Sequence, residues 1–347
     1  MTEQSHIKVL ITGASGFIGS HLVQEALDQG WSVYAGVRRS SSKQYLSDPR
    51  LRFFHVDLEQ PELLHDDLAA FTHAEGGFDY IIHNAGVTKP RDAQEFVRGN
   101  ADFTREFGRA ARDTQPGLKK FVFMGSIAAL GPALSDTRAI HERMDPAPIT
   151  PYGKSKLLAE QYLEETRKLP YVTVRPAAVY GPRDEKMILR LIRLLERGIE
   201  VRLGPADQAL SFVHVADLAN VVIRACTSAQ RRTSYLISDG GSYSQQHFNA
   251  TIKSCLGIRT VAVRVPTAVL MGFGYTAYRA MQVLGKPVHL SHFKMREITA
   301  RNWRVDISKA RQELGFVPGY DLQSGVRHTV DWYLAHRERG KKERATP

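Results

Sequence analysis

Short apolar runs alternate with longer helix-like segments through the first half of this chain, and this alternation restricts its fold more than any other feature. The runs are rich in β-branched and aromatic residues, and they predict strands at residues 7–11, 32–37, 52–56, 78–83, 119–124 and 171–175. Apolar residues at helical spacing predict helices between them, at residues 17–29, 61–71, 93–112 and 151–168. Strands joined through helices form parallel sheets that are covered on both faces. The sequence therefore predicts an α/β fold built on a doubly wound parallel sheet.

A glycine-rich turn, T-G-A-S-G-F-I-G from Thr12 to Gly19, joins the first expected strand to the first helix. Its first glycine permits a tight turn, its second lets the backbone approach a pyrophosphate, and its third lets the helix pack close to the sheet. The pyrophosphate would lie on the free N–H groups at the positive end of the helix. We therefore expect a Rossmann fold that binds a dinucleotide, with a purely structural turn as the alternative. The cofactor-binding residues of the turn would be Gly13, Ser15, Gly16, Phe17, Ile18 and Gly19.

The alternation stops after residue 176, where we expect a region of different architecture. The next elements are expected to be a helix, a strand and a helix, at residues 185–197, 210–215 and 216–227. We expect a dinucleotide-binding domain at residues 1–176, with residues 206–238 returning to it. Residues 177–205 and 239–335 would form a smaller C-terminal substrate lobe, and residues 336–347 would form a basic tail.

The ends of the second and third strands bear on which dinucleotide binds. An NAD enzyme usually places Asp or Glu after the second strand, to bind the ribose hydroxyls. This chain has Arg38 and Arg39 there, followed by three serines. Guanidinium groups bind phosphate oxygens bidentately, so we expect NADP as cofactor, with NAD or a solvated basic loop as alternatives. Asp57, expected to bind the cofactor together with Leu58, could accept a hydrogen bond from the adenine amino group or could simply cap a turn.

Three residues suited to acid–base chemistry follow the fifth strand. Tyr152 and Lys156 are four apart at the start of a helix, so they share one face of it. The ammonium could lower the pKa of the phenol and bind the nicotinamide ribose, and the phenol could then act as general acid or base on a carbonyl or carbinol oxygen. Ser126 lies at the carboxyl edge of the sheet and could hydrogen-bond the same oxygen. We expect these three residues to be catalytic, with Tyr152 and Lys156 also contacting the cofactor.

Together these motifs resemble the extended short-chain dehydrogenases/reductases, a family of nucleotide-sugar epimerases, dehydratases, 3β-hydroxysteroid dehydrogenases and dihydroflavonol-type reductases. The resemblance covers nearly the whole chain. Besides the glycine turn, it rests on HNAG from His83, GSIAALG from Gly125, PYGKSK from Pro151, RPAAVYGPRD from Arg175, FVHVADLA from Phe212 and KARQELGFVP from Lys309.

The resemblance implies further cofactor contacts. Ala85 and Gly86 would pass under the dinucleotide, and the segment from Pro176 to Val179 would contact its nicotinamide end. Arg38 falls where the dihydroflavonol-type reductases that use NADP carry an arginine. The family likeness also implies a homodimer.

Two departures from the family pattern argue against two of the family's activities. Enzymes of sugar nucleotides usually carry an arginine where this chain has Ala209-Leu210, and dehydratases carry a carboxylate where it has Ile127-Ala128. We therefore expect an NADP-preferring oxidoreductase that transfers hydride to or from a ketone or secondary alcohol. The first alternative is an epimerase of the same fold, and the second is an NADP(H)-sensing binding protein. The substrate itself is not identified.

Composition and charge exclude other classes of protein. The net charge of +11 is scattered, apart from the tail, so we expect no nucleic-acid partner. The two cysteines and the isolated histidines lack the spacing of metal ligands, so we expect no metal. Without a signal-peptide layout or a run of ~20 apolar residues, a cytoplasmic protein with no membrane partner is expected. The apolar residues 266–282 predict a core helix, with a lid over a hydrophobic substrate as the alternative.

Overall fold

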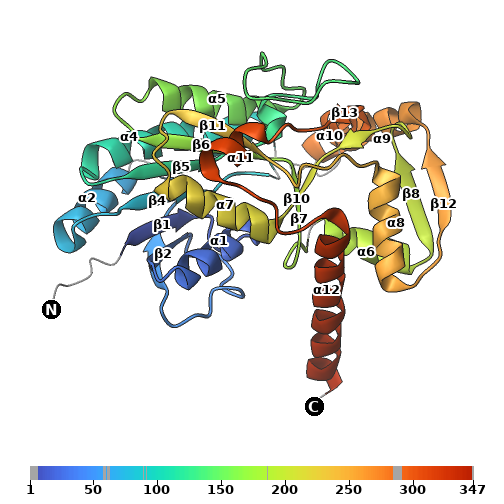
Figure 1. The fold of residues 1–347 in the computed structure, drawn as a ribbon, viewed down its shortest axis with the longest axis horizontal. Coiled ribbons are helices and arrows are strands. Elements are labelled where there is room, and N and C mark those ends of the chain that lie inside the picture. Colours follow the sequence, from blue (N-terminus) through green and yellow to red (C-terminus); the bar gives the residue numbers. More distant parts are fainter. Residues whose placement is uncertain are drawn as a thin grey trace.

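A seven-stranded parallel sheet forms the centre of the molecule in the computed structural model, which describes residues 7–57, 60, 63–88, 90, 92–185, 187–283 and 291–345 (Figure 1). The strand order is β11-β6-β5-β4-β1-β2-β3. The strands are β1 (Lys8–Thr12), β2 (Ser32–Val37), β3 (Arg52–His55), β4 (Tyr80–His83), β5 (Lys120–Met124), β6 (Tyr171–Pro176) and β11 (Thr233–Ile237). The predicted doubly wound parallel sheet is confirmed. Because the order reverses between β1 and β4, a crevice for ligands is expected at the carboxyl ends of these two strands.

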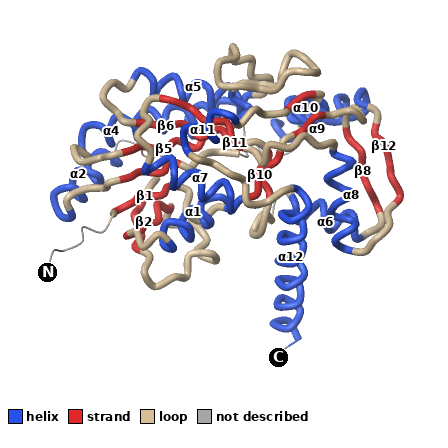
Figure 2. The backbone as a smooth tube through the Cα atoms, viewed as in Figure 1, coloured by secondary structure: helices blue, strands red, loops and turns tan. Residues whose placement is uncertain are grey.

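Helices cover both faces of the sheet, as Figure 2 shows. On one side lie α1 (Phe17–Asp28), α7 (Val215–Thr227) and α11 (Ser308–Leu314), and on the other lie α2 (Leu63–Glu75), α4 (Phe103–Thr114) and α5 (Pro151–Glu165). Side chains along β1 point alternately to the two faces of the sheet. Val9 and Ile11 therefore join one buried cluster and Leu10 joins the other.

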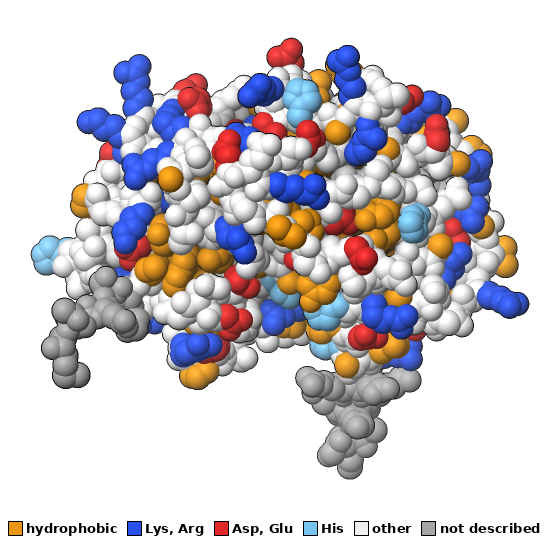
Figure 3. All heavy atoms as spheres, viewed as in Figure 1, with side chains coloured by type: hydrophobic (Ala, Val, Ile, Leu, Met, Phe, Trp, Pro, Cys, Tyr) orange, Lys and Arg blue, Asp and Glu red, His pale blue; other side chains and the backbone are white. Residues whose placement is uncertain are grey.

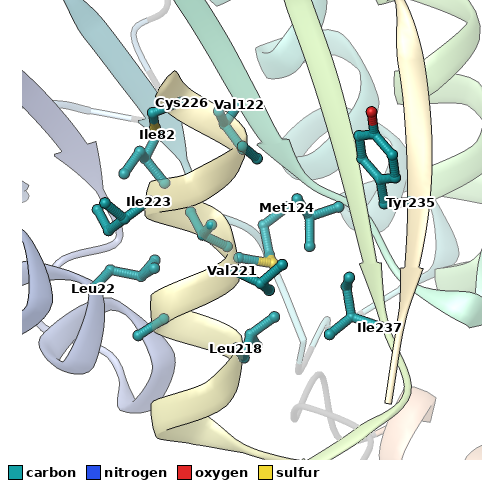
Figure 4. Close-up of a cluster of buried hydrophobic side chains, with 14 of the residues drawn as sticks. Leu22, Ile82, Val122, Met124, Leu218, Val221, Ile223, Cys226, Tyr235 and Ile237 are labelled. Carbon is teal, nitrogen blue, oxygen red and sulfur yellow. The ribbon is translucent and has the colours of Figure 1, made fainter. Parts of the chain in front are cut away.

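The cluster on the α7 side contains side chains that are far apart in sequence. Figure 4 shows Leu218 and Val221 of α7 lying against Val122 and Met124 of β5. Tyr235 of β11 belongs to the same cluster, so the last strand of the sheet shares a core with the first ones. Burial of this size makes the sheet a rigid base for the loops at its carboxyl edge.

The helix expected at residues 93–112 is interrupted. It consists of α3 (Ala93–Phe96), a π-helical turn at Val97–Asp102 and α4. Gly99 packs in this turn against Val87, where a Cβ on the glycine would lie 2.3 Å from the Val87 Cγ2 atom. Such turns often occur at functional sites, and this one brings Asn100 toward the loop after β4.

The prediction of a single strand at residues 210–215 is wrong. The segment is divided into β9 (Ala209–Leu210), which pairs with β13 (Asn302–Trp303), and β10 (Phe212–His214), which pairs with β7 (Ala178–Tyr180). The division occurs at Ser211, whose hydroxyl donates to the Gly241 carbonyl and accepts from the Val305 amide. Val215 already belongs to α7.

The remaining elements gather at the end of the molecule away from β2 and β3 (Figure 1). They are β8 (Ile199–Leu203) paired with β12 (Val261–Val265), and the helices α6 (Ile188–Glu196), α8 (Gln245–Leu256), α9 (Thr267–Val283), α10 (His292–Thr299) and α12 (Leu322–Ala345). A separate buried cluster around Tyr180, Phe212 and Phe248 holds α6, α8 and α12 together. Within the described ranges, no helix is both long enough and apolar enough to cross a membrane.

Candidate active site

The glycine turn has the geometry of a backbone cradle. Gly13 has φ +66°, and a Cβ there would lie 2.9 Å from the Cα atom of Ala85. A Cβ on Gly19 would lie 2.0 Å from the Gly13 carbonyl oxygen, so only glycine lets α1 start this close to the turn. Gly16 is the N-cap residue of α1, and no side chain of the described structure caps the first amides of this helix. These amides therefore remain available to an anion.

A chain of buried hydrogen bonds fixes the loop after β4 against this turn. The Ala85 amide donates to the Thr12 hydroxyl, which lies 2.8 Å from Nδ1 of His83, and Nε2 of His83 lies 2.9 Å from the Thr104 hydroxyl. Thr104 donates in turn to the Asn100 carbonyl. Burial and nearby Lys156 hold the pKa of His83 well below its usual value, so the ring is neutral and has one N–H. Because Thr104 uses its proton on Asn100, the His83 N–H must lie on Nε2, and Nδ1 accepts from Thr12.

Asn100 holds the same loop from the other side. Its Oδ1 atom accepts from the Val87 amide at 2.7 Å, and its Nδ2 atom donates to the Val87 carbonyl and to the Ser155 hydroxyl. A Cβ on Gly86 would lie 2.8 Å from that Oδ1 atom. Asn100 therefore ties the loop at Gly86 to α5, the helix that carries Tyr152. The sequence signal for it is a polar residue within an otherwise helical segment, and the site residues expected from sequence did not include it.

The three expected catalytic residues meet at the carboxyl edge of the sheet. Ser126 follows β5 and accepts from the Ala128 amide at 3.1 Å, and its hydroxyl also hydrogen-bonds Tyr152. Tyr152 and Lys156 lie in the first turns of α5, which Thr150 caps by accepting from the Gly153 amide. They line one cavity of about 200 Å³ together with residues from the other loops. Among these are Ile18, Gly86, Val87, Met124, Pro176, Ala177 and Val179.

The ionisation of this group differs from the expectation. Burial, and next the carboxylate of Glu297, raise the pKa of Tyr152 to about 12, against the opposing hydrogen bond from Ser126. Burial lowers the pKa of Lys156 to about 8, and Glu160 opposes this shift. Any lowering of the phenol's pKa by Lys156 is outweighed here by burial, and the Lys156 ammonium donates to the Met124 carbonyl at 2.8 Å. At neutral pH the site therefore contains a protonated phenol and a mostly charged ammonium.

A buried ion pair lies next to Lys156, with its carboxylate on the same helix. Glu160 follows Lys156 by one helical turn and accepts from Arg175 of β6, with Arg175 Nε 3.1 Å from both carboxylate oxygens. Both side chains are buried. A Cβ on Gly125 would lie 2.8 Å from Glu160 Oε1, so the pair also fixes the path of the chain just before Ser126. The sequence gives little sign of this pair, because its partners are 15 residues apart on different elements.

The expected adenosine-binding residues lie at the other half of the same edge. Arg38 follows β2 and is exposed, and its backbone forms a turn with Ser41. Arg39 is exposed beside it. Asp57 follows β3, which pairs with β2 through Val37 and His55. Leu58 lies outside the described residues. The Ala14 amide contacts the Gly36 carbonyl at 3.4 Å, so the Arg38 turn begins two residues after a contact with the glycine turn.

Comparison with known proteins agrees with this arrangement. The family model described as NAD dependent epimerase/dehydratase family matches residues 9–238. A ceramide reductase of Caulobacter vibrioides is 28% identical over 330 residues, which cover 94% of each chain. A sterol-4-alpha-carboxylate 3-dehydrogenase of Candida albicans is 23% identical over 95% of this chain and 98% of its own. The crystal structure of a UDP-glucose 4-epimerase from Thermotoga maritima has a similar fold, with a TM-score of 0.78 and 23% identity over 95% of this chain and 99% of its own.

Proposed function

Since this chain belongs to the NAD dependent epimerase/dehydratase family, we propose that it is an NADP-preferring oxidoreductase acting on a ketone or secondary alcohol. It is a nicotinamide-dependent enzyme of the extended short-chain dehydrogenase/reductase type. The observation that carries the proposal is that Ser126, Tyr152 and Lys156 line a single cavity. A proton donor, a second hydroxyl and an ammonium therefore surround the position that a carbonyl oxygen would take.

The residues at the sheet edge fit a dinucleotide. The cradle around Gly13 and Gly19 leaves no room for a Cβ. The uncapped amides of α1 suit the pyrophosphate of the dinucleotide. Arg38 would bind the 2′-phosphate, and Lys156 would bind the hydroxyls of the nicotinamide ribose. Val179, with Pro176, would contact the nicotinamide end. When bound, the dinucleotide supplies or accepts the hydride.

The protein's part in the reaction is to orient the carbonyl and to move a proton. In the reduction, Tyr152 donates its phenolic proton to the carbonyl oxygen as the carbon receives the hydride, and Ser126 hydrogen-bonds the same oxygen. The raised pKa of Tyr152, about 12, keeps it in the donor form at neutral pH. Lys156, with a pKa of about 8, is mostly charged there and stabilises the phenolate that forms. Solvent then restores the proton of the phenol.

The case for an apolar substrate comes from similar proteins and not from the cavity, because Ile18, Ala177 and Val179 line the part that we assign to the nicotinamide end of the dinucleotide. We propose that residues 177–205 and 239–335 form the lobe that binds the rest of the substrate. One similar protein is named a ceramide reductase and another a sterol-4-alpha-carboxylate 3-dehydrogenase, so both names give a lipid as the substrate.

An epimerase acting on a nucleotide sugar is the second candidate. The fold of the UDP-glucose 4-epimerase supports it. Ala209 argues against it, because this residue of β9 pairs with β13 and offers no guanidinium for a diphosphate. An NADP(H)-sensing protein is the least supported candidate, since both Tyr152 and Lys156 are present.

The test is the consumption of NADPH with a panel of apolar ketones, compared with NADH, on protein checked for co-purified nucleotide. We expect nucleotide-free protein, net oxidation of NADPH with at least one ketone, and a loss of about 10²- to 10⁴-fold in Tyr152→Phe. Tyr162→Phe, which alters a tyrosine in the last turn of the same helix, is the control. Protein that retains its nucleotide and gives no net turnover would instead support the epimerase.

A further inference from the structure

The helix α9 is exposed along an apolar face, although its composition predicts a core helix. Val269, Phe273 and Tyr275 are 58%, 56% and 56% exposed. The opposite side of the helix is in contact with α10, since Leu270 is buried and a Cβ on Gly274 would lie 2.8 Å from the Met295 Cγ atom. A helix that faces water normally carries charged and polar residues on its outer side. The expectation of a core helix is therefore wrong, and the exposed face of α9 needs another explanation.

The two-stranded sheet next to α9 also has an apolar outer face. Val261 and Val263 of β12 are 73% and 47% exposed, and their register partners on β8 are Ile199 and Val201. The intervening Glu200 is buried on the opposite face, where it bonds Lys253 of α8. Because side chains alternate along a strand, α8 covers one face and leaves the valine face to the outside. β12 continues through Pro266 into α9, so the two apolar faces belong to one segment of the chain.

The charge of residues 259–301, which include β12, α9 and α10, is mostly positive. Their described basic residues are Arg259, Arg264, Arg279, Lys294, Arg296 and Arg301, and their described acidic residue is Glu297. Lys294 pairs with Glu297, and Arg301 lies within ion-pair distance of Asp136 and Asp207. Arg264 alternates with the valines of β12 and so lies on the other face of that strand, whereas Arg259 and Arg279 are exposed at the ends of the apolar segment. Figure 3 shows hydrophobic and basic side chains next to one another at this end of the molecule.

We propose that the exposed face of α9, together with the outer face of β8 and β12, docks this protein on a membrane surface that contains anionic phospholipids. Apolar side chains flanked by arginines are the pattern by which a helix lies in the membrane interface without crossing it. A second copy of this chain is a poor occupant, because two faces with the same positive charge repel each other. The proposal concerns the membrane surface and departs from the expectation of no membrane partner, which the experiment below tests.

The docking surface is connected to the active site. α10 packs on α9, and Glu297 of α10 is close enough to Tyr152 to raise its pKa. Trp303 donates to the Glu297 carbonyl at 3.0 Å, which joins α10 to β13. When α9 docks on a membrane, α10 would therefore lie close to the lipid surface together with Tyr152, which it adjoins.

The experiment is sedimentation of the full-length protein with vesicles of phosphatidylcholine alone and with added phosphatidylglycerol. We expect sedimentation with the anionic vesicles, weakened by salt because exposed charges are screened. Val269→Ser with Phe273→Ser should weaken binding by about tenfold or more, which corresponds to ~1.4 kcal/mol per tenfold. Val317→Ser is the matched control, since Val317 is 82% exposed on the loop before α12.

The outcomes distinguish a membrane from a protein as the partner of this surface. They do not depend on the enzymatic reaction. Failure of the unaltered protein to sediment with anionic vesicles would overturn the proposal. Equal loss of binding in Val317→Ser would also overturn it, because that result would mean non-specific hydrophobic adsorption. If the double variant changed the oligomeric state and not vesicle binding, the surface would be a protein interface instead. Thermal melting by circular dichroism would establish that each variant is folded.

Discussion

Lys156 sets the alkaline limit of the chemistry that we propose. Its pKa is lowered to about 8 because the ammonium is buried, and Glu160 keeps it from falling further. Below that pH the ammonium is charged and can stabilise the phenolate of Tyr152. We expect the rate of ketone reduction to fall as pH rises through about 8, although Tyr152 still holds its proton there.

Glu160→Gln supplies the matching test by pH–rate profiles. Without the carboxylate, burial acts on Lys156 unopposed, so the alkaline limb should move to lower pH. Lys154→Gln alters an exposed lysine on the same helix and should leave the limb unchanged. An alkaline limb that did not move in Glu160→Gln would show that another group controls it.

Arg38 determines the preference between the two dinucleotides in our proposal. It is exposed at the end of β2 and has no acidic partner among the described residues, so its guanidinium can bind a phosphate. Arg38→Ala should weaken NADPH binding by about 10- to 100-fold, since a hydrogen bond to a charged group contributes ~1.5–3 kcal/mol. NADH binding should stay nearly unchanged. Calorimetric titration measures both, with the exposed Arg193→Ala on α6 as control. Equal weakening of NADH would assign Arg38 a general role in binding.

At the scale of elements, the π-helical turn at Val97–Asp102 connects α4 to the loop after β4. The side chain of Asn100 in this turn makes three hydrogen bonds, two with Val87 and one with Ser155. In Asn100→Ala the buried Val87 amide loses its acceptor, which costs ~1–3 kcal/mol. We expect a lower free energy of unfolding and weaker dinucleotide binding, measured by chemical denaturation and titration. Gln94→Ala, at an exposed position of α3, should change the stability little. A stable Asn100→Ala protein with unchanged binding would contradict this role.

The sequence predicted the elements well where local pattern decides them. β2 occupies the predicted residues, and most other strands and helices differ from prediction by a few residues at their ends. Prediction from the sequence was wrong where contacts between residues far apart in the chain determine how an element ends. Ser211 ends a strand because of Gly241 and Val305, and the π turn depends on Val87. Exposure of α9 was missed because an apolar helix has the same composition in a core as on a surface.

For the whole molecule, the prediction of the site depended on topology. Once the strands are parallel, their carboxyl ends meet at one edge, so Gly13, Gly86 and Ser126 must lie near one another. Ser126, Tyr152 and Lys156 do line one cavity, as topology requires, but Val87 and Met124 line it as well and were not expected. The sequence did not predict the ionisation of the site, since the pKa of Tyr152 depends on burial and on Glu297 from a distant helix. The homodimer implied by the family likeness stays a prediction, which analytical ultracentrifugation would test.

The last prediction concerns the stability of the molecule as a whole. A dinucleotide bound along this edge would contact the turn after β1, the ends of β2 and β4, and α5, so it would add a further connection between the two halves of the sheet, whose strands pair between β1 and β4. A ligand that binds only the native state stabilises it by ~2.7 kcal/mol at a concentration of about 100 times its Kd. NADPH should then raise the melting temperature by about 5 °C, and NADH at the same concentration should raise it less. Arg38→Ala should remove the difference between the two. Equal shifts in the unaltered protein would contradict the preference for NADP while leaving dinucleotide binding itself supported.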